Sequence, residues 1–132
     1  MTNPSLPTSL QKLREWLEME GFDLIESQYR DSDFGNTLLL FRRHGLSIRM
    51  IRDRGQWFVE AADADVTEWF SPMVWRAYLD GRVGAITTPT IDEQCQMFED
   101  DLERIQIAIS TDPDVFEHLR SCRAERAQSR RG

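Results

Sequence analysis

The sequence is poor in the residues from which metal sites and catalytic centres are most often built. It has two cysteines and two histidines in 132 residues, and the histidines, His44 and His118, stand far apart along the chain. Zinc-site spacings such as Cys-x-x-Cys or His-Glu-x-x-His do not occur, and neither do glycine-rich phosphate loops. We therefore expect no metal, no cofactor and no enzymatic activity.

Long apolar runs are equally scarce. The longest purely aliphatic and aromatic run is the four residues from Leu38 to Phe41, whereas a membrane-spanning helix needs about 20. The first ten residues lack the basic stretch and apolar run of a secretory signal. Cys95 and Cys122 fall on apolar helical positions, which favours structural thiols over a disulfide. These features predict a cytoplasmic protein that does not bind a membrane.

Two acidic turns could suggest calcium, but the one with Asp63, Asp65 and Glu68 lacks the central glycine of a calcium loop. Asp31-Ser32-Asp33-Phe34-Gly35-Asn36 resembles the start of a calcium loop. The twelfth position of such a loop would be Arg42, where a bidentate Glu is needed. We therefore interpret this segment as a solvated turn and not as a metal site.

The charge of the chain is acidic and unevenly distributed. The formal net charge is −7, from 16 Lys and Arg against 23 Asp and Glu. Residues 1–117 have a balance of −11, with 11 basic and 22 acidic side chains, whereas residues 118–132 have five arginines and one glutamate, a balance of +4. An acidic body does not follow a phosphate backbone, so nucleic acid is not expected as a partner. The basic tail is expected to contact an acidic partner or the body itself.

The first half of the chain is predicted to form a helix followed by an antiparallel sheet. The helix is expected over 9–20 and begins with a capping box from Thr8 to Gln11. Two-residue breaks that contain glycine, between runs of β-forming residues, are typical of hairpins. Together with the turn-rich segment 31–36, these breaks divide the next part of the chain into expected strands over 22–30, 37–43, 46–52 and 56–62.

The register of the last three strands follows from their hydrophobic pattern. If Arg43 faces Leu46 and Asp53 faces Gln56, one face of the sheet becomes almost wholly apolar. That face collects Leu39, Phe41, Ile48, Met50, Trp57, Val59 and Ala61. The opposite face mixes apolar and polar side chains, namely Leu38, Leu40, Ile51 and Phe58 with Arg42, Ser47, Arg49 and Glu60. Because apolar patches rarely stay bare, we expect the helix over 91–109 to cover this second face.

The second half of the chain is predicted to be helical. Ser71-Pro72 and the capping box from Thr90 to Glu93 are typical helix starts, and Gly81 is a typical stop. The clearest helix is expected over 91–109, where apolar residues recur at alternating spacings of four and three. A last helix is expected to start at Asp112-Pro113.

These elements predict a single α+β domain over residues 1–125. Its sheet is an antiparallel meander of about four strands, with an N-terminal helix and two to three C-terminal helices. Residues 126–132 are expected to be a frayed basic tail, because the apolar pattern stops beyond Glu125.

Two features suggest a surface for a protein partner. Trp69 and Phe70 follow the sheet close to three carboxylates, and an exposed aromatic pair framed in this way would anchor a cationic surface. The expected helix over 91–109 carries a dense set of acids on its outward side, which is either a solvated helix face or a surface for a basic protein. The candidate binding residues are Asp63, Asp65, Glu68, Trp69, Phe70, Glu99, Asp100, Asp101 and Glu103.

Three stretches of the chain resemble a known type of protein. They are Phe34-Gly35-Asn36 through Asp53-Arg54-Gly55-Gln56-Trp57-Phe58-Val59, then Trp69-Phe70, and then Trp75-Arg76-Ala77-Tyr78-Leu79-Asp80-Gly81. Together they are similar to small, mostly uncharacterised bacterial proteins, some of which resemble immunity proteins of polymorphic toxin systems. The likeness covers roughly residues 34–81, and its motifs are structural, so no functional residue is carried over.

The resemblance implies a cytoplasmic, non-enzymatic protein that binds one protein partner, such as a basic toxin. Two alternatives stay open. One is an acidic secretion chaperone that binds a segment of an effector, and the other is a small-molecule-binding domain. The sequence leaves open whether the protein is a monomer or a homodimer.

Overall fold

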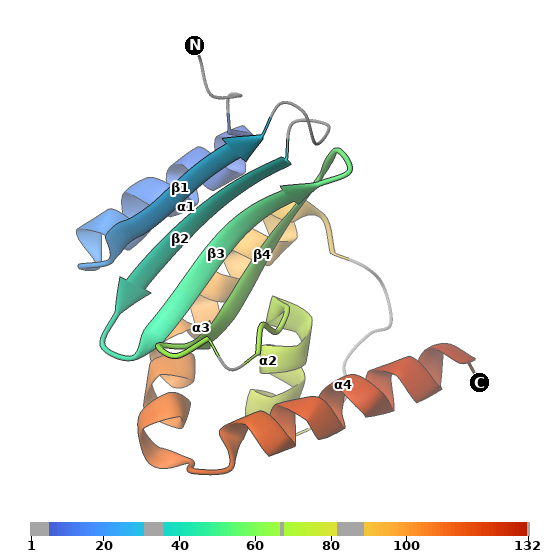
Figure 1. Cartoon of the computed structure of the whole chain (residues 1–132). Coiled ribbons are helices and arrows are strands. Elements are labelled where there is room, and N and C mark those ends of the chain that lie inside the picture. Colours follow the sequence, from blue (N-terminus) through green and yellow to red (C-terminus); the bar gives the residue numbers. More distant parts are fainter. Residues whose placement is uncertain (1–5, 31–35, 67, 82–88, 132) are drawn as a thin grey trace.

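The protein has an α+β fold, which confirms the predicted fold class. A computed structural model describes residues 6–30, 36–66, 68–81 and 89–131. An N-terminal helix precedes a four-stranded antiparallel meander, and three helices follow it (Figure 1). The elements are α1 (Thr8–Met19), β1 (Asp23–Arg30), β2 (Asn36–Arg43), β3 (Leu46–Asp53), β4 (Gln56–Asp63), α2 (Pro72–Asp80), α3 (Ile91–Thr111) and α4 (Val115–Arg131).

The strand order is β1-β2-β3-β4, and the predicted register of the last three strands is confirmed. Arg43 pairs with Leu46 and Asp53 pairs with Gln56. In the β2–β3 turn both central residues have positive φ, 46° at His44 and 82° at Gly45. The β3–β4 turn repeats this geometry, which matches the right-handed twist of the paired strands.

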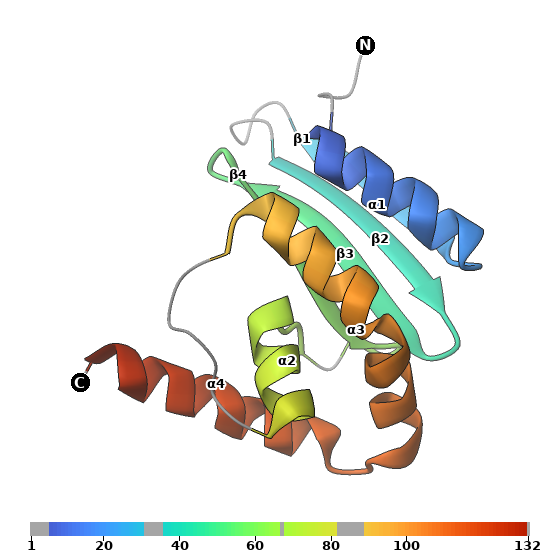
Figure 2. The same cartoon turned by 180° about the vertical axis from the view of Figure 1, so that it is seen from behind.

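Helices α1 and α3 both pack on the almost wholly apolar face of the sheet, as the view from behind shows (Figure 2). The side chains of Phe41, Ile48, Met50 and Val59 on this face are fully buried. The expectation that the helix over 91–109 covers the second face is therefore wrong. The physical reason is that the second face interleaves charged residues with its apolar ones, so water can cover it at lower cost.

The starts of α2 and α3 are as predicted, whereas α4 begins at Val115 and not at Asp112-Pro113. The Ser71 hydroxyl accepts a hydrogen bond from the Val74 N–H, and α2 ends at Gly81 with a left-handed φ of 71°. Thr90 and Glu93 form both hydrogen bonds of the capping box of α3.

Two further predictions concern the start of α1 and the end of α4. The capping box predicted from Thr8 to Gln11 is wrong, because Pro7 precedes the helix without a side-chain cap and the Gln11 amide donates to the Leu6 carbonyl oxygen at 2.7 Å. Helix α4 is assigned through Arg131, and fraying of the tail beyond Glu125 stays a prediction. The suggested calcium loop lies at 31–36, almost all of it outside the described residues.

Other parts of the core agree with the sequence pattern. Trp75 is fully buried, and its indole N–H donates to the Ala61 carbonyl oxygen at 3.2 Å. Cys95 is buried and Cys122 is partly buried, and both are free thiols. Within the described residues no helix has the length and apolar character needed to cross a membrane.

Candidate functional site

Helix α3 presents most of its acidic residues to solvent. It contains six acidic residues and one basic residue. That basic residue, Arg104, is bonded to Asp80 and Asp101 at 3.0 and 2.8 Å, so its charge is already balanced within the fold. Five of the acids are exposed or half-buried, and one of these, Glu93, caps the helix. We call the other four the acidic face of α3: Asp92, Glu99, Asp100 and Glu103.

The ion pairs between the acidic face of α3 and the rest of the protein are weak. Asp100 lies 3.8 Å from Arg76, and Glu103 lies 3.9 Å from Arg43. The side chains of the two acids are 55% and 76% exposed. Exposed pairs of this kind contribute about 0–1 kcal/mol to stability. The charges of the acidic face are therefore available to a partner without loss of the fold.

Asp101 does not belong to this face, contrary to the expectation from sequence. It is 4% exposed and accepts hydrogen bonds from Arg76 Nε at 2.9 Å and Arg104 Nη2 at 2.8 Å. The bond from Arg104 to Asp101, followed by its bond to Asp80, raises the pKa of Arg104 above its ordinary value. Asp101 thus joins α2 to α3 inside the protein, where no partner reaches it.

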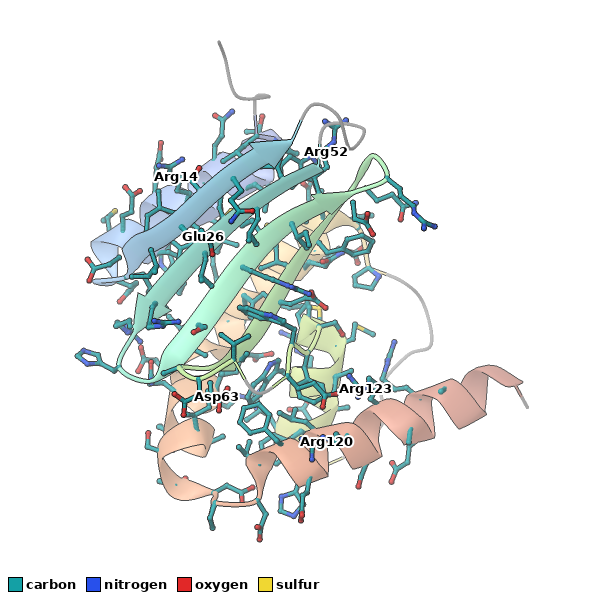
Figure 3. All side chains as sticks on the ribbon, viewed as in Figure 1. Arg14, Glu26, Arg52, Asp63, Arg120 and Arg123 are labelled. Atoms are coloured by element: carbon teal, nitrogen blue, oxygen red, sulfur yellow. The ribbon has the colours of Figure 1, made fainter. Side chains whose placement is uncertain are left out.

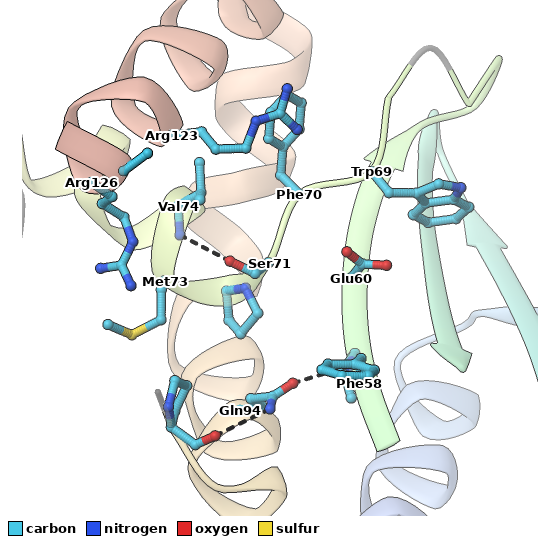
Figure 4. A pocket seen from close by; sticks show the side chains of 14 residues that line it. Phe58, Glu60, Trp69, Phe70, Ser71, Met73, Val74, Gln94, Arg123 and Arg126 are labelled. Atoms are coloured by element: carbon cyan, nitrogen blue, oxygen red, sulfur yellow. Dashed lines mark hydrogen bonds between the residues drawn. The ribbon is translucent and has the colours of Figure 1, made fainter. Parts of the chain in front are cut away.

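The expected exposed aromatic pair is also corrected. Phe70 is 1% exposed and forms a short bridge with Ala61 at the edge of β4. Its ring packs against that of Phe116, with the centroids 6.0 Å apart. Neighbouring residues of an extended segment point to opposite sides, so Trp69 turns the other way, as Figure 4 shows. Trp69 is half-buried, with the Arg49 guanidinium 4.6 Å from its ring centroid.

Glu68 is neutralised within the chain by the basic helix α4. The two arginines involved, Arg120 and Arg123, are labelled on this helix in Figure 3. The Glu68 carboxylate accepts hydrogen bonds from Arg120, at 2.9 Å, and from Arg123. The hydrogen bond from Arg120 is the largest cause that lowers the pKa of Glu68 below its ordinary value. The basic tail therefore contacts the body of the protein, which is one of the two outcomes expected from its charge.

The two remaining candidate acids lie after the sheet. Asp63 is the last residue of β4 and is partly buried, whereas Asp65 in the following turn is exposed. The structure thus separates the predicted site into exposed acids on α3, an exposed Asp65, and residues that serve the fold.

Within the part of the chain that the structure describes, no helix packs on the second face of the sheet, a feature that the sequence did not predict. Figure 3 shows Glu26 projecting from this side. Arg49 and Glu60 form an ion pair across β3 and β4, which are neighbouring strands. We call the partly exposed apolar residues of this surface the open sheet face: Leu38, Leu40, Ile51 and Phe58.

A cleft beside β4 was also missed. Its volume is about 490 Å³, and it lies between β4, the segment 69–74 that leads into α2, the start of α3 and the end of α4 (Figure 4). The signal that could have revealed it is Arg126. Val115, Leu119 and Cys122 form the inward stripe of α4 at spacings of four and three, and Arg126 occupies the next position of that stripe.

One cluster of titratable groups joins three elements. The Asp112 carboxylate accepts a hydrogen bond from the Tyr78 hydroxyl at 2.6 Å and lies 2.9 Å from Nδ1 of His118. The bond from Tyr78 is the largest cause that lowers the pKa of Asp112, whereas burial, followed by this bond, raises the pKa of Tyr78 to about 12. The cluster fixes the α3–α4 corner against α2.

No group of three or more His, Cys, Asp or Glu side chains among the described residues is placed to hold a metal ion. Comparison of this chain with protein-family models, with curated proteins and with solved structures found no match.

Proposed function

We propose that this chain is a non-enzymatic, cytoplasmic protein-binding module that meets a basic protein surface through the acidic face of α3. The observation that carries the proposal is a difference among the acidic residues of α3: some of them stabilise the fold, and the others do not. Asp101 is buried between two arginines, and Glu93 caps the helix. The four residues of the acidic face make no comparable contribution to the fold, although they share the helix with these two.

The positions of these acids add to this argument. Glu99 and Glu103 are four residues apart, so their carboxylates are neighbours on the helix surface and repel each other. Such a pair costs a helix about 0.2–0.5 kcal/mol. Asp92 by contrast lies in the first turn, where a negative charge is favourable. Charges that lower the stability of an element without forming strong contacts are expected where they serve binding.

The biological role that we propose is that of an immunity protein, which neutralises a toxin by binding it. A dense negative surface steers a basic partner toward the complex and gives rapid association at low salt. The resemblance of residues 34–81 to immunity-like bacterial proteins supports the same role. The binding surface proposed here no longer includes Phe70, Glu68 or Asp101, because each of them is used inside the protein.

The proposal is tested by affinity capture from the native host with three baits. They are the wild type, a triple variant of the acidic face (Glu99→Lys, Asp100→Lys and Glu103→Lys), and a control with the same change in net charge. The control reverses three exposed acids elsewhere, Glu15→Lys, Glu117→Lys and Glu125→Lys.

We expect the wild type and the control to capture the same basic protein and the triple variant to lose it. Expression of that protein alone should stop growth, and co-expression of this chain should restore it. Equal capture by all three baits would exclude the acidic face of α3 as the binding surface. Capture of a protein that is harmless on its own would exclude the immunity role.

The open sheet face supports a second candidate function, an acidic secretion chaperone that holds an effector segment. Phe58 is 36% exposed there, and its strand neighbour Ile51 is partly exposed. A chaperone of this kind is expected to be a dimer by light scattering and to lose its effector on Phe58→Asp. An immunity protein should keep its toxin in that variant.

A further inference from the structure

The cleft beside β4 has the size and lining of a small-molecule site. Its volume of about 490 Å³ lies within the range of about 300–1,000 Å³ that is typical of ligand pockets. The walls come from four separate parts of the chain, which Figure 4 shows converging on one space. Apolar side chains predominate in this lining, among them Phe58, Phe70, Pro72, Met73 and Val74.

A buried cationic side chain lies in the lining of this apolar cleft. Arg126 lines it, as Met73 does, and is only 9% exposed (Figure 4). Arginine keeps its charge when it is buried, and its attraction for an anion is stronger in an apolar site than in water. Its guanidinium has five N–H donors in a planar fork, which suits a carboxylate even when some of the donors serve contacts within the protein.

The other charged groups that line the cleft are more exposed than Arg126. Glu60 is neutralised by Arg49. Arg123 is bonded to Glu68 and lies over the Phe70 ring, 4.8 Å from its centroid. Arg126 is the most deeply buried of these charged groups, so its charge is the least screened by water and attracts an anion most strongly. The apolar walls suit an alkyl or aryl group.

We propose that this cleft binds a small amphipathic monocarboxylate. Its carboxylate contacts Arg126, and its apolar part packs against Phe58, Met73 and Val74. Apolar contact supplies much of the affinity, and the guanidinium selects acids over uncharged molecules of the same shape. None of these residues belongs to the acidic face of α3, so the ligand site is independent of the proposed binding of a basic protein.

The test compares two probes of equal chain length, octanoate and octan-1-ol, on the full chain with methyl-labelled methionine. Titration by nuclear magnetic resonance should shift the Met73 methyl signal with octanoate and leave that of Met19, which is 85% exposed, in place. Octanoate should bind at least about tenfold more tightly than octanol, as expected for a hydrogen-bonded charge pair.

Three variants assign the roles of the side chains. Arg126→Met should remove the preference for octanoate, because methionine keeps an apolar stem without a charge. Phe58→Ala should weaken both probes. Arg14→Met, a change on α1 away from the cleft, should alter neither affinity.

The wild-type measurement decides the proposal even if Arg126→Met does not fold. Absence of binding, equal affinity for the two probes, or shifts at Met19 without shifts at Met73 would each overturn it. A folded Arg126→Met that keeps the full preference for octanoate would do the same.

Discussion

Asp101 offers the sharpest test of how this fold uses its acidic residues. The perturbation is Asp101→Asn, which keeps the size of the side chain and removes its charge. The aspartate is 4% exposed and accepts hydrogen bonds at 2.9 and 2.8 Å from Arg76 and Arg104. We expect the substitution to destabilise the protein, because it leaves two arginines facing a neutral amide.

The magnitude follows from the burial of the three groups. Removing one partner of a fully buried ion pair costs about 3–5 kcal/mol. The side chains of Arg76 and Arg104 are 36% and 47% exposed, so water can solvate them after the change. A value near that of a charged hydrogen bond is therefore appropriate, about 2 kcal/mol. For a domain of this size that corresponds to a decrease of roughly 6 °C in the melting temperature.

The assay is urea unfolding followed by far-ultraviolet circular dichroism, with Glu103→Gln as the matched control. Glu103 lies on the same helix but is 76% exposed, so its substitution should change stability by less than about 0.5 kcal/mol. A double-mutant cycle with Arg104→Gln should give a positive coupling energy with Asp101. If Asp101→Asn costs no more than Glu103→Gln, the assignment of Asp101 to the interior of the fold is refuted.

Three further predictions concern other buried or bonded groups. The pKa of Asp112 is lowered in the folded state, so its carboxylate stabilises the protein at neutral pH. This contribution is lost as the pH falls below about 4. The urea midpoints of the wild type and Asp112→Asn should therefore differ at pH 7 and converge near pH 2. The Gln94 side-chain oxygen accepts the outer N–H of β4 at 3.1 Å, so Gln94→Leu should cost about 1–3 kcal/mol in urea unfolding, whereas the exposed Gln96→Leu should cost far less. Burial raises the pKa of Cys95 to about 12, so iodoacetamide at pH 8 should modify Cys122 first, as peptide mass spectrometry would show; equal rates would contradict the buried position of Cys95.

The sheet and its hairpins could be predicted from the sequence because local patterns determine them. Apolar and polar residues alternate along three strands, and one register places the apolar residues of all three on the same face. A slip of one residue would place charged side chains on that face. The same is true of α3, whose capping box and spacing of apolar residues mark both its start and its buried side. These signals depend on near neighbours, so no knowledge of the tertiary structure is needed.

The position of α3 on the sheet could not be predicted in the same way. Both faces of the sheet carry apolar residues, and only the packed structure reveals that the open sheet face is left to solvent. The burial of Asp101 and Phe70 depends on where α2 and α4 dock. Each is a contact between residues far apart in the sequence, and periodicity does not encode it.

Arg126 was overlooked for a related reason. It continues the inward stripe of α4, but the end of an apolar pattern in a basic segment is typical of a solvated tail. The cleft that surrounds it is formed by the sheet, α2 and α4 together, and its walls come from residues that each have an ordinary core or surface role in the sequence.

The central claim, that the acidic face of α3 binds a basic protein, is tested most directly by one calorimetric titration. The captured partner is titrated into the wild type and into the triple variant Glu99→Lys, Asp100→Lys and Glu103→Lys at physiological salt, after circular dichroism has established that both are folded. We predict that the dissociation constant of the variant is at least about 100-fold higher, because three cations then face a basic surface. A dissociation constant within about threefold of the wild-type value would contradict the claim.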